Sequence, residues 1–432
     1  MLDVLLGRTG RNCQGTSRRD FLRVGGLGFA GLTLPRLLQA RAQAAEATRR
    51  DTAVIWLWLN GGPTHIETFD PKMNAPVEFR SVTGEVKTRL PGVTLGGNFE
   101  RLATCADKMA IVRSFEVPTS SHNRGCFWVN TGYEERANRP SLGSISSRVR
   151  GPNHPKTGIP TYVRIGRVGF GDEANRMAGP AWLGKAYAPF EPEGPARENM
   201  QLTTEVHRLA DRRDLLSKLD LMRRQVDASG MMEGIDGFNQ QAIDLILGNA
   251  ADAFDLQKES PQTIERYGEG LGQSLLTARR LCEAGCGFVT VGFQGWDMHG
   301  SIQRGMNRLG PEVDQAVSAL IEDIYARGLD QKILFVVTGE FGRTPRINQR
   351  AGRDHWGPLS TLAFAGGGLN MGQVIGESSP KAETPATTPI TPQDLMATVF
   401  HVLGISPDVH FEDPAGRPVP MLADGRPIAD LV

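Results

Sequence analysis

The sequence predicts an α/β protein whose central sheet contains parallel strands, and three observations support this class. Short apolar runs rich in Val, Ile and Leu, such as 53–59 and 333–337, are typical of strands that are buried on both faces. Both runs end in glycine-rich polar loops, which is where open α/β sheets position their ligands. A helical pattern from Pro311 to Arg327 separates strand 287–291 from strand 333–337, which indicates a right-handed βαβ unit.

The other elements follow from local patterns along the chain. Apolar runs predict further strands at 110–115, 161–165 and 359–365. Apolar spacing and capping residues predict helices near 99–108, from about 122 to 131, 141–150, 264–282 and 392–403. Long helical patterns between 203 and 285 indicate a helical insertion, about 200–285, that packs on the sheet or on a partner.

Length and charge limit the classes of function. At 432 residues and 47.0 kDa the chain can form one large α/β domain or two smaller ones. Lys+Arg and Asp+Glu both number 48, so there is no global basic field of the kind that binds nucleic acid. A hydrophobic content of 40% with 51 glycines favours a loop-rich globular protein over a disordered one.

The N-terminus has the pattern of an export signal. Arg18 and Arg19 precede a glycine-rich apolar stretch, 24–34, that is too short to span a bilayer, and an Ala-x-Ala cleavage site follows at 42–44. Paired arginines before a weakly apolar region resemble a bacterial twin-arginine signal. We therefore expect residues 1–44 to be removed by the twin-arginine export machinery. The mature domain, 45–432, is expected in the periplasm without a membrane span.

The stretch from Ile333 to Pro358 is the centre of the predicted site. Glu340 lies between glycines directly after a buried strand, and Asp354 and His355 follow in the same stretch together with four arginines. Core packing does not require these polar groups. The alternative is a surface loop that is solvated by its own ion pairs, but binding groups concentrate on loops that a rigid scaffold holds.

A second loop adds a metal-binding pair. Asp297 and His299 follow the strand at 287–291, where a carboxylate oxygen and an imidazole nitrogen can turn toward one cation. Because the two strands of the βαβ unit end side by side, we expect Asp297, His299, Glu340 and His355 to converge.

Two further loops carry candidate groups. Ser120, Ser121 and His122 stand at the start of a predicted helix, where they are a nucleophile, a base and an anion cradle, or an ordinary helix cap. His65 follows the first strand in a glycine-rich loop, and its alternatives are a site residue or a turn cap.

Several motifs together resemble one family over nearly the whole mature chain. They are NGGPTHIETFDPK, GWDMHG, GEFGRTPRIN, GRDHWGP and TPQDLMATVFHVLGI. They are similar to the exported bacterial family of unknown function 1501 (DUF1501), which is described as sulfatase-like and placed in the alkaline-phosphatase superfamily. The resemblance implies a three-layer sandwich with a mixed, mostly parallel sheet, and metal ions at the strand ends that activate a nucleophile on a phosphate or sulfate ester.

The superfamily pattern is only half matched. Asn60 stands where the superfamily has a metal-binding Asp, and Glu340 stands where an Asp-His pair supplies two ligands. The sulfatase nucleophile would fall on His122, so the mechanism that needs a modified Cys is not expected. Asp297, His299 and His355 match the other metal site, with His65 and Asp354 as further candidate ligands.

The resemblance implies a metal-dependent hydrolase of sulfate or phosphate esters. One divalent ion, Zn, Ca or Mn, would be bound there, and the partner would be an anionic ester, either a small molecule or a polysaccharide. Arg343 or Arg124 would hold the anionic group, Ser120 or Ser121 would attack with His122 as base, or water would attack directly. The alternative is a non-catalytic periplasmic binding or scaffold protein that has kept the fold and a degraded site.

Overall fold

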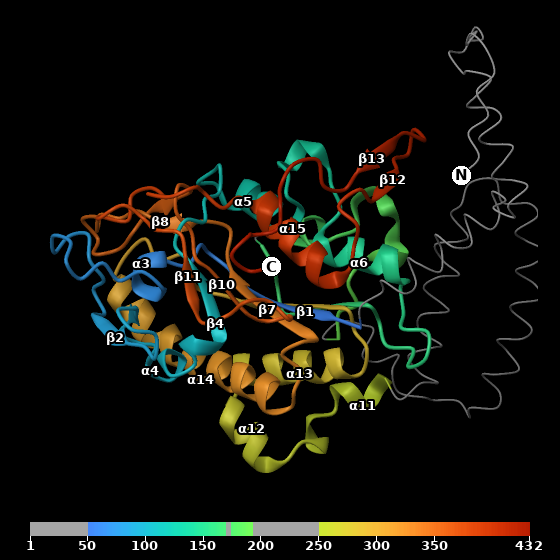
Figure 1. Ribbon diagram of the computed structural model, residues 1–432, viewed down its shortest axis with the longest axis horizontal. Coiled ribbons are helices and arrows are strands. Elements are labelled where there is room, and N and C mark those ends of the chain that lie inside the picture. Colours follow the sequence, from blue (N-terminus) through green and yellow to red (C-terminus); the bar gives the residue numbers. More distant parts are fainter. Residues whose placement is uncertain (1–50, 170–173, 193–249) are drawn as a thin grey trace, which may run out of the picture. The chain divides into compact units, whose positions relative to one another are not determined.

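The computed structural model describes residues 51–169, 174–192 and 250–432. The predicted export signal and most of the predicted helical insertion lie outside the described residues. In the described part the predicted fold class is confirmed, because a mostly parallel sheet lies between two layers of helices (Figure 1).

The central sheet has seven strands in the order β11-β4-β10-β7-β1-β6-β5. Six of them run parallel to one another, and only β10 is antiparallel to its neighbours β4 and β7. The strands are β1 (Ala53–Leu59), β4 (Met109–Val112), β5 (Tyr162–Ile165), β6 (Phe288–Phe293), β7 (Ile333–Thr338), β10 (Leu362–Gly366) and β11 (Gln373–Ile375). The short edge strand β11 has no counterpart among the predicted strands.

The central strands are buried on both faces, as their continuous apolar sequence predicts. In β1, Ile55 and Leu57 point into one hydrophobic core, while Trp56 and Trp58 point into the other. All seven residues of β1 are buried. This two-sided burial explains why the run shows no polar alternation.

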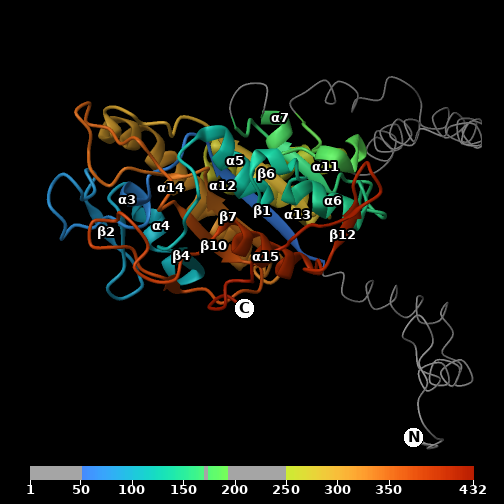
Figure 2. The ribbon, with the colours of Figure 1, turned by 90° about the horizontal axis from the view of Figure 1, so that it is seen from above.

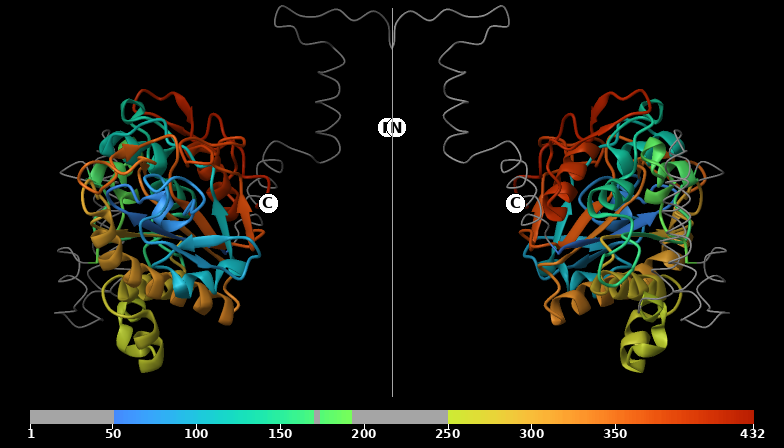
Figure 3. Two further views of the ribbon diagram at one scale, coloured as in Figure 1. Left: turned by 90° about the vertical axis from the view of Figure 1, so that its left-hand side faces the viewer. Right: turned by 90° about the vertical axis from the view of Figure 1, so that its right-hand side faces the viewer.

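The helices form two layers, one on each face of the sheet, as Figures 1 and 3 show. One layer contains α4 (Glu100–Ala103), α11 (Ala250–Phe254), α12 (Pro261–Tyr267), α13 (Leu271–Glu283) and α14 (Ile302–Ala326). The other contains α5 (His122–Thr131), α6 (Leu142–Arg150) and α15 (Pro392–Leu403). Seen from above in Figure 2, α5, α6 and α15 lie over the strands. Each layer has its own buried core.

Helix α14 begins at Ile302, nine residues before the predicted start at Pro311. The two glycines and the proline at 305–311 argue against a helix in this segment. However, Ile302, Met306 and Leu309 are buried on the stripe that continues through Val313. Packing of this stripe against the core therefore overrides the local propensity, and Pro311 lies inside the helix.

Smaller elements complete the described part. The predicted helix at 264–282 is two helices, α12 and α13, because Gly268 and Gly270 both have positive φ. Three two-stranded sheets lie outside the central one, and they are β2–β3 (Glu85–Lys87, Thr94–Gly96), β8–β9 (Gly342–Arg343, His355–Trp356) and β12–β13 (His410–Glu412, Pro418–Pro420). Among the described residues, no helix is long and apolar enough to cross a membrane.

Candidate metal centre

The candidate site lies at the ends of four strands of the central sheet, where loops begin. The loops after β1, β6 and β7 and the segment between β4 and α5 meet there, and α3 (His65–Thr68) and β8 lie at the same end of the sheet (Figure 1). This is the edge at which α/β sheets place their ligands.

Three of the predicted metal ligands present their donor atoms to one another. His299 Nε2 lies 2.9 Å from His355 Nε2, and these two nitrogens lie 3.0 Å and 3.2 Å from Asp297 Oδ1. His299 and Asp297 come from the loop after β6, and His355 comes from β9. Residues 58 positions apart in the sequence thus form a triangle of one oxygen and two nitrogens.

The hydrogen bonds of the two imidazoles fix which nitrogen can accept. His355 Nδ1 lies 3.0 Å from the carbonyl oxygen of Ser120, and His299 Nδ1 lies 2.7 Å from Asp354 Oδ1. Both oxygens are acceptors, so each Nδ1 donates its proton there and each ring turns its Nε2 toward the triangle. One oxygen and two nitrogens therefore face a common point.

The donor set fits a divalent cation. Tetrahedral ligands at zinc–nitrogen and zinc–oxygen distances lie about 3.4 Å from one another, close to the separations in the triangle. Histidines that ligate metals also donate their second ring N–H to a carboxylate or a backbone carbonyl, which is the arrangement of Asp354 with His299 and of Ser120 with His355. Asp354 Oδ1 accepts a hydrogen bond from His299 Nδ1 and so orients this ring.

His122 extends the cluster. Single donor atoms of His122, Asp297 and His355 lie within 4.8 Å of one another. His122 Nδ1 is 2.8 Å from Glu340 Oε1, and its Nε2 is 3.5 Å from Asp297 Oδ2. Burial lowers the pKa of His122, but the hydrogen bonds to Asp297 and Glu340 outweigh burial and raise the pKa to about 9.

Glu340 is fully buried, and its two carboxylate oxygens differ in their hydrogen bonds. Oε1 accepts hydrogen bonds from the backbone N–H of Gly61 and from His122, both at 2.8 Å. Oε2 is buried and has no hydrogen-bond partner among the described residues. An unpaired carboxylate oxygen costs free energy in the interior, so a cation or a proton is expected near it.

Arg343 is not placed to hold a substrate anion. The guanidinium is fully buried, and it donates to the carbonyl oxygens of Gly61, Gly62 and Arg353 and to Asp297 Oδ1 at 2.6 Å. Its donors are used within the chain, so Arg343 positions Asp297. Burial raises the pKa of Asp297, but its hydrogen bonds with His122, His355 and Arg343 outweigh burial and hold the pKa far below the usual range.

Close packing fixes the floor of the site. The buried ring of Phe341 lies 4.9 Å from the ring of His122 and 4.6 Å from that of His355, measured between centroids. A Cβ on Gly62 would lie 2.5 Å from the Phe341 ring, and one on Gly125 would lie 2.5 Å from the Glu340 carbonyl oxygen. Glycine at these two positions is therefore required for the approach of β1 and α5 to the Glu340 loop.

His65 does not join the cluster, although the sequence made it a candidate ligand. It is the first residue of α3 and is 4% exposed, and its Nε2 lies 3.2 Å from the carbonyl oxygen of Ala382. Burial lowers the pKa of His65 to about 4, so the ring is neutral. Its Nδ1 has no partner among the described residues and lines a small cavity with Asp70 and Arg113.

The two candidate nucleophiles lie at the entrance to α5. Ser121 is the N-cap residue of α5, and its exposed side chain makes no capping hydrogen bond. Ser120 is also exposed, and its Oγ accepts a hydrogen bond from the backbone N–H of Gly357 at 2.9 Å. Arg124, on the first turn of α5, is exposed as well.

Three residues support the site through contacts that the sequence did not predict. Glu67 and Arg353, both fully buried, form an ion pair at 2.9 Å that ties α3 to the loop before His355. Asn60 holds the end of β1 because its side chain accepts from Trp58 and Gly169 and donates to the Arg167 carbonyl oxygen. No local pattern reveals such long-range contacts, although an Asn directly after a buried strand is a signal for Asn60.

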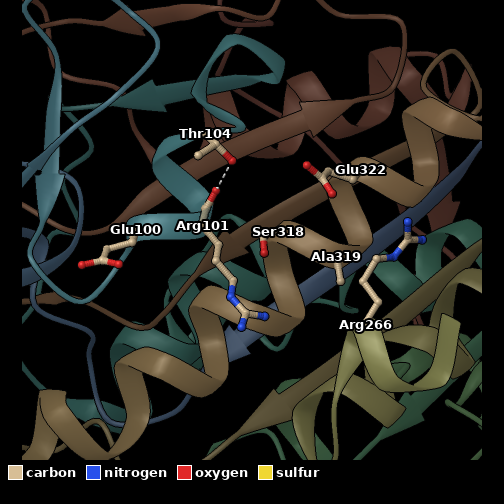
Figure 4. A pocket seen from close by; sticks show the side chains of 7 residues that line it. All are labelled: Glu100, Arg101, Thr104, Arg266, Ser318, Ala319 and Glu322. Carbon is tan, nitrogen blue, oxygen red and sulfur yellow. Dashed lines mark hydrogen bonds between the residues drawn. The ribbon is translucent and has the colours of Figure 1, made fainter. Parts of the chain in front are cut away.

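A pocket of about 300 Å³ lies elsewhere, in the helix layer formed by α4, α12 and α14 (Figure 4). Its walls carry Arg101 and Arg266, and Ser318 and Ala319 lie on α14. The pocket shares no residue with the histidine cluster, and we do not assign the chemistry to it.

Fold and site together define an α/β protein with a histidine–carboxylate cluster at the carboxyl ends of a mostly parallel sheet. The chain belongs to the DUF1501 family of proteins of unknown function, whose family model matches residues 51–432.

No curated protein matches the chain. Similar solved structures include the sulfatase PsFucS1 from Pseudoalteromonas sp., with 12% identity, a TM-score of 0.38, and coverage of 86% of this chain and 71% of that one. The phosphonate monoester hydrolase SpPMH from Silicibacter pomeroyi is 14% identical, with a TM-score of 0.33 and coverage of 88% and 76%. A variant of the alkaline phosphatase TAB5 is 11% identical, with a TM-score of 0.35 and coverage of 81% and 97%.

Proposed function

We propose that the protein is a metal-dependent hydrolase of sulfate or phosphate esters. The observation that carries the proposal is the triangle of His299 Nε2, His355 Nε2 and Asp297 Oδ1, in which both Nδ1 atoms are committed as donors. A divalent cation held by these three residues supplies Lewis-acid polarisation of an ester oxygen.

The remaining residues of the site orient the three proposed ligands through hydrogen bonds. Asp354 and the Ser120 carbonyl oxygen keep the two ligand histidines in the Nδ1–H tautomer. Arg343 fixes Asp297, and the buried ring of Phe341 packs against the rings of His122 and His355. Glu340 accepts a hydrogen bond from His122 Nδ1, and His122 Nε2 lies 3.5 Å from Asp297 Oδ2.

Ser121 is the better placed of the two candidate nucleophiles. Its side chain is exposed and makes no capping hydrogen bond, while the Ser120 hydroxyl already accepts one from Gly357. The first N–H groups of α5 have no partner within the helix, and they point toward the space in front of Ser121. Attack by Ser121 or by water is compatible with this arrangement.

We also place the enzyme in the bacterial cell envelope, after export through the twin-arginine pathway. The proposal is supported by the paired arginines at 18–19 and the Ala-x-Ala site at 42–44. Its substrate class is an anionic ester, on a small molecule or on a polysaccharide.

A second candidate function is a binding or scaffold protein without catalysis. The observation in its favour is Asn60, which occupies the position of a superfamily metal ligand but uses its amide for hydrogen bonds within the chain.

Metal analysis separates the two functions. We expect the purified chain to contain about one equivalent of a divalent ion by mass spectrometry, and His299→Ala and His355→Ala to lose it. His410→Ala, which changes an exposed histidine in β12, is the matched control and should keep the ion. Hydrolysis of nitrophenyl sulfate or phosphate that disappears with the ion supports the hydrolase. A folded, metal-free protein would contradict it and favour the binding protein.

A further inference from the structure

The turn at 348–352 lies directly against the main chain of His299. A Cβ on Gly352 would lie 2.2 Å from the carbonyl carbon of His299, so the two backbones are in contact and glycine is required here. The N–H of Ile302, at the start of α14, donates to the Ala351 carbonyl oxygen at 2.8 Å. The turn therefore holds the chain between His299 and α14.

The side chain of Asn348 closes this turn. Its Oδ1 accepts hydrogen bonds from the backbone N–H groups of Arg350, at 2.9 Å, and of Gly352, at 3.0 Å. Ala351 lies between these two residues and has a φ of 53°, in the left-handed region that residues other than glycine rarely adopt. The hydrogen bonds of Asn348 thus stabilise a backbone conformation that alanine alone does not favour.

The amide nitrogen of the same side chain donates to two groups of the candidate metal centre. Asn348 Nδ2 lies 3.0 Å from the carbonyl oxygen of His299 and 3.2 Å from Asp354 Oδ1. Asp354 Oδ1 is also the oxygen that lies 2.7 Å from His299 Nδ1. Asn348 therefore contacts both the main chain of His299 and the carboxylate that orients its ring.

The chemistry of this position requires an amide. An Asn side chain has two N–H donors and two acceptor lone pairs, and Asn348 uses all four. The reverse orientation of the amide would place its N–H groups against two backbone N–H groups, so the orientation is fixed. Aspartate at this position would offer no donor, and leucine would offer neither a donor nor an acceptor.

We propose that Asn348 is a positioning residue of the metal centre, which fixes the main chain of His299 and the Asp354 oxygen that orients the His299 ring. The inference rests on the proposed function for the cation that His299 would bind. The position of the His299 ring itself is measurable in the metal-free protein.

The test uses two uncharged variants of the full chain. Asn348→Leu keeps the shape of the side chain and removes its hydrogen bonds. Asn348→Ser keeps one oxygen that can accept within the turn, so it carries the test if the first variant does not fold. Asn370→Leu, at an exposed position outside the site, is the matched control. Ser260→Ala removes the cap of α12 and controls for a general loss of stability.

The first measurement is NMR of the metal-free chain labelled with ¹⁵N-histidine. The Nδ1–H signal of His299, assigned by its absence in His299→Ala, should be protected from exchange because Asp354 accepts this proton. We expect the signal to shift or disappear in both Asn348 variants and to stay unchanged in both controls. A signal that is unchanged in both Asn348 variants would overturn the proposal.

The second measurement is calorimetric titration with Zn²⁺, together with the visible absorption spectrum of bound Co²⁺. Each Asn348 variant should bind Zn²⁺ about tenfold more weakly or worse, because residues that orient a metal ligand have effects of this size. The Co²⁺ spectrum should change as well, since it reports the geometry of the ligands. An equal loss of Zn²⁺ affinity in Ser260→Ala would overturn the proposal, because the effect would then be one of stability alone.

Two further outcomes separate this inference from the proposed function. A His299 signal that depends on Asn348, in a protein that binds no divalent ion, supports the positioning role while the hydrolase fails. Zn²⁺-dependent cleavage of a nitrophenyl ester, with Zn²⁺ affinity and a His299 signal that are unchanged in the Asn348 variants, overturns the positioning role while the hydrolase stands.

Discussion

The buried ion pair between Glu67 and Arg353 gives the sharpest test of how the site is supported. Both side chains are fully buried, and Arg353 Nε and Nη2 donate to both carboxylate oxygens at 2.9 to 3.2 Å. Arg353 also donates to the carbonyl oxygens of Thr344, Pro345 and Arg80. The pair thus anchors the loop that immediately precedes Asp354 and His355.

Glu67→Gln keeps the shape of the side chain but removes its charge. The Arg353 guanidinium would then be buried without a counter-ion, and an amide N–H₂ would face its donors. Removal of one partner of a buried pair costs about 3–5 kcal/mol, so the free energy of unfolding should fall by that amount. Urea unfolding followed by circular dichroism measures it. The metal content should also fall, because His355 loses its anchored loop.

Two comparisons make the reasoning refutable. Glu67→Met/Arg353→Met removes both charges and should destabilise the protein less than Glu67→Gln does, since no charge is left unpaired. Lys332→Gln breaks a 3.8 Å pair with Asp51 whose side chains are 59% and 87% exposed, and should change stability by less than about 1 kcal/mol. A loss of less than about 1 kcal/mol in Glu67→Gln would show that the pair does not hold the loop.

Three further predictions concern single side chains. Burial lowers the pKa of His65 from 6.5 to about 4, so on acidification the unfolded state takes up a proton before the folded state does. The free energy of unfolding should therefore be complete above pH 6.5 and fall by about 3 kcal/mol as the pH drops to 4. His65→Asn should lack this pH dependence in urea unfolding. Gly125→Ala places a Cβ 2.5 Å from the Glu340 carbonyl oxygen and should lower the free energy of unfolding by about 1–3 kcal/mol in the same assay. An unchanged free energy of unfolding would contradict the tight fit. Asn60→Asp loses the donor to Arg167 and should destabilise by about 1–3 kcal/mol without raising the metal content; a gain of bound ion would refute the structural role of Asn60.

The central sheet could be predicted because each of its core strands consists of one continuous apolar run. β1 has the predicted limits, 53–59, and β7 extends the predicted run by one residue, to Thr338. The predicted start of α14 was wrong because it followed local helix propensity, whereas packing against the core determines where this helix begins. The edge strand β11 is only three residues long, which is too short to carry a pattern.

The site could be predicted as a set of residue types but not as a set of roles. Asp297, His299 and His355 were grouped because each follows a strand, and the structure brings them together. Arg343 also follows a strand in the sequence, yet its guanidinium is buried and donates to backbone carbonyl oxygens within the protein. The exposure of a side chain, and the contact of Glu67 with Arg353 across 286 residues of sequence, depend on the tertiary fold, which spacing does not reveal.

The hydrogen bonds around Asn60 and Glu340 decide which of their side-chain atoms could bind a metal ion. A ligand oxygen must keep a lone pair free for the metal, but both polar atoms of the Asn60 side chain are used between Trp58, Arg167 and Gly169. Glu340 Oε1 is likewise occupied by Gly61 and His122, whereas its Oε2 has no hydrogen-bond partner among the described residues. Of these two residues, only Glu340 therefore keeps an oxygen that a cation or a proton could satisfy. At Asp297 the three atoms of the proposed metal site face one another, so the hydrolase that we propose should lose its activity when the cation is removed.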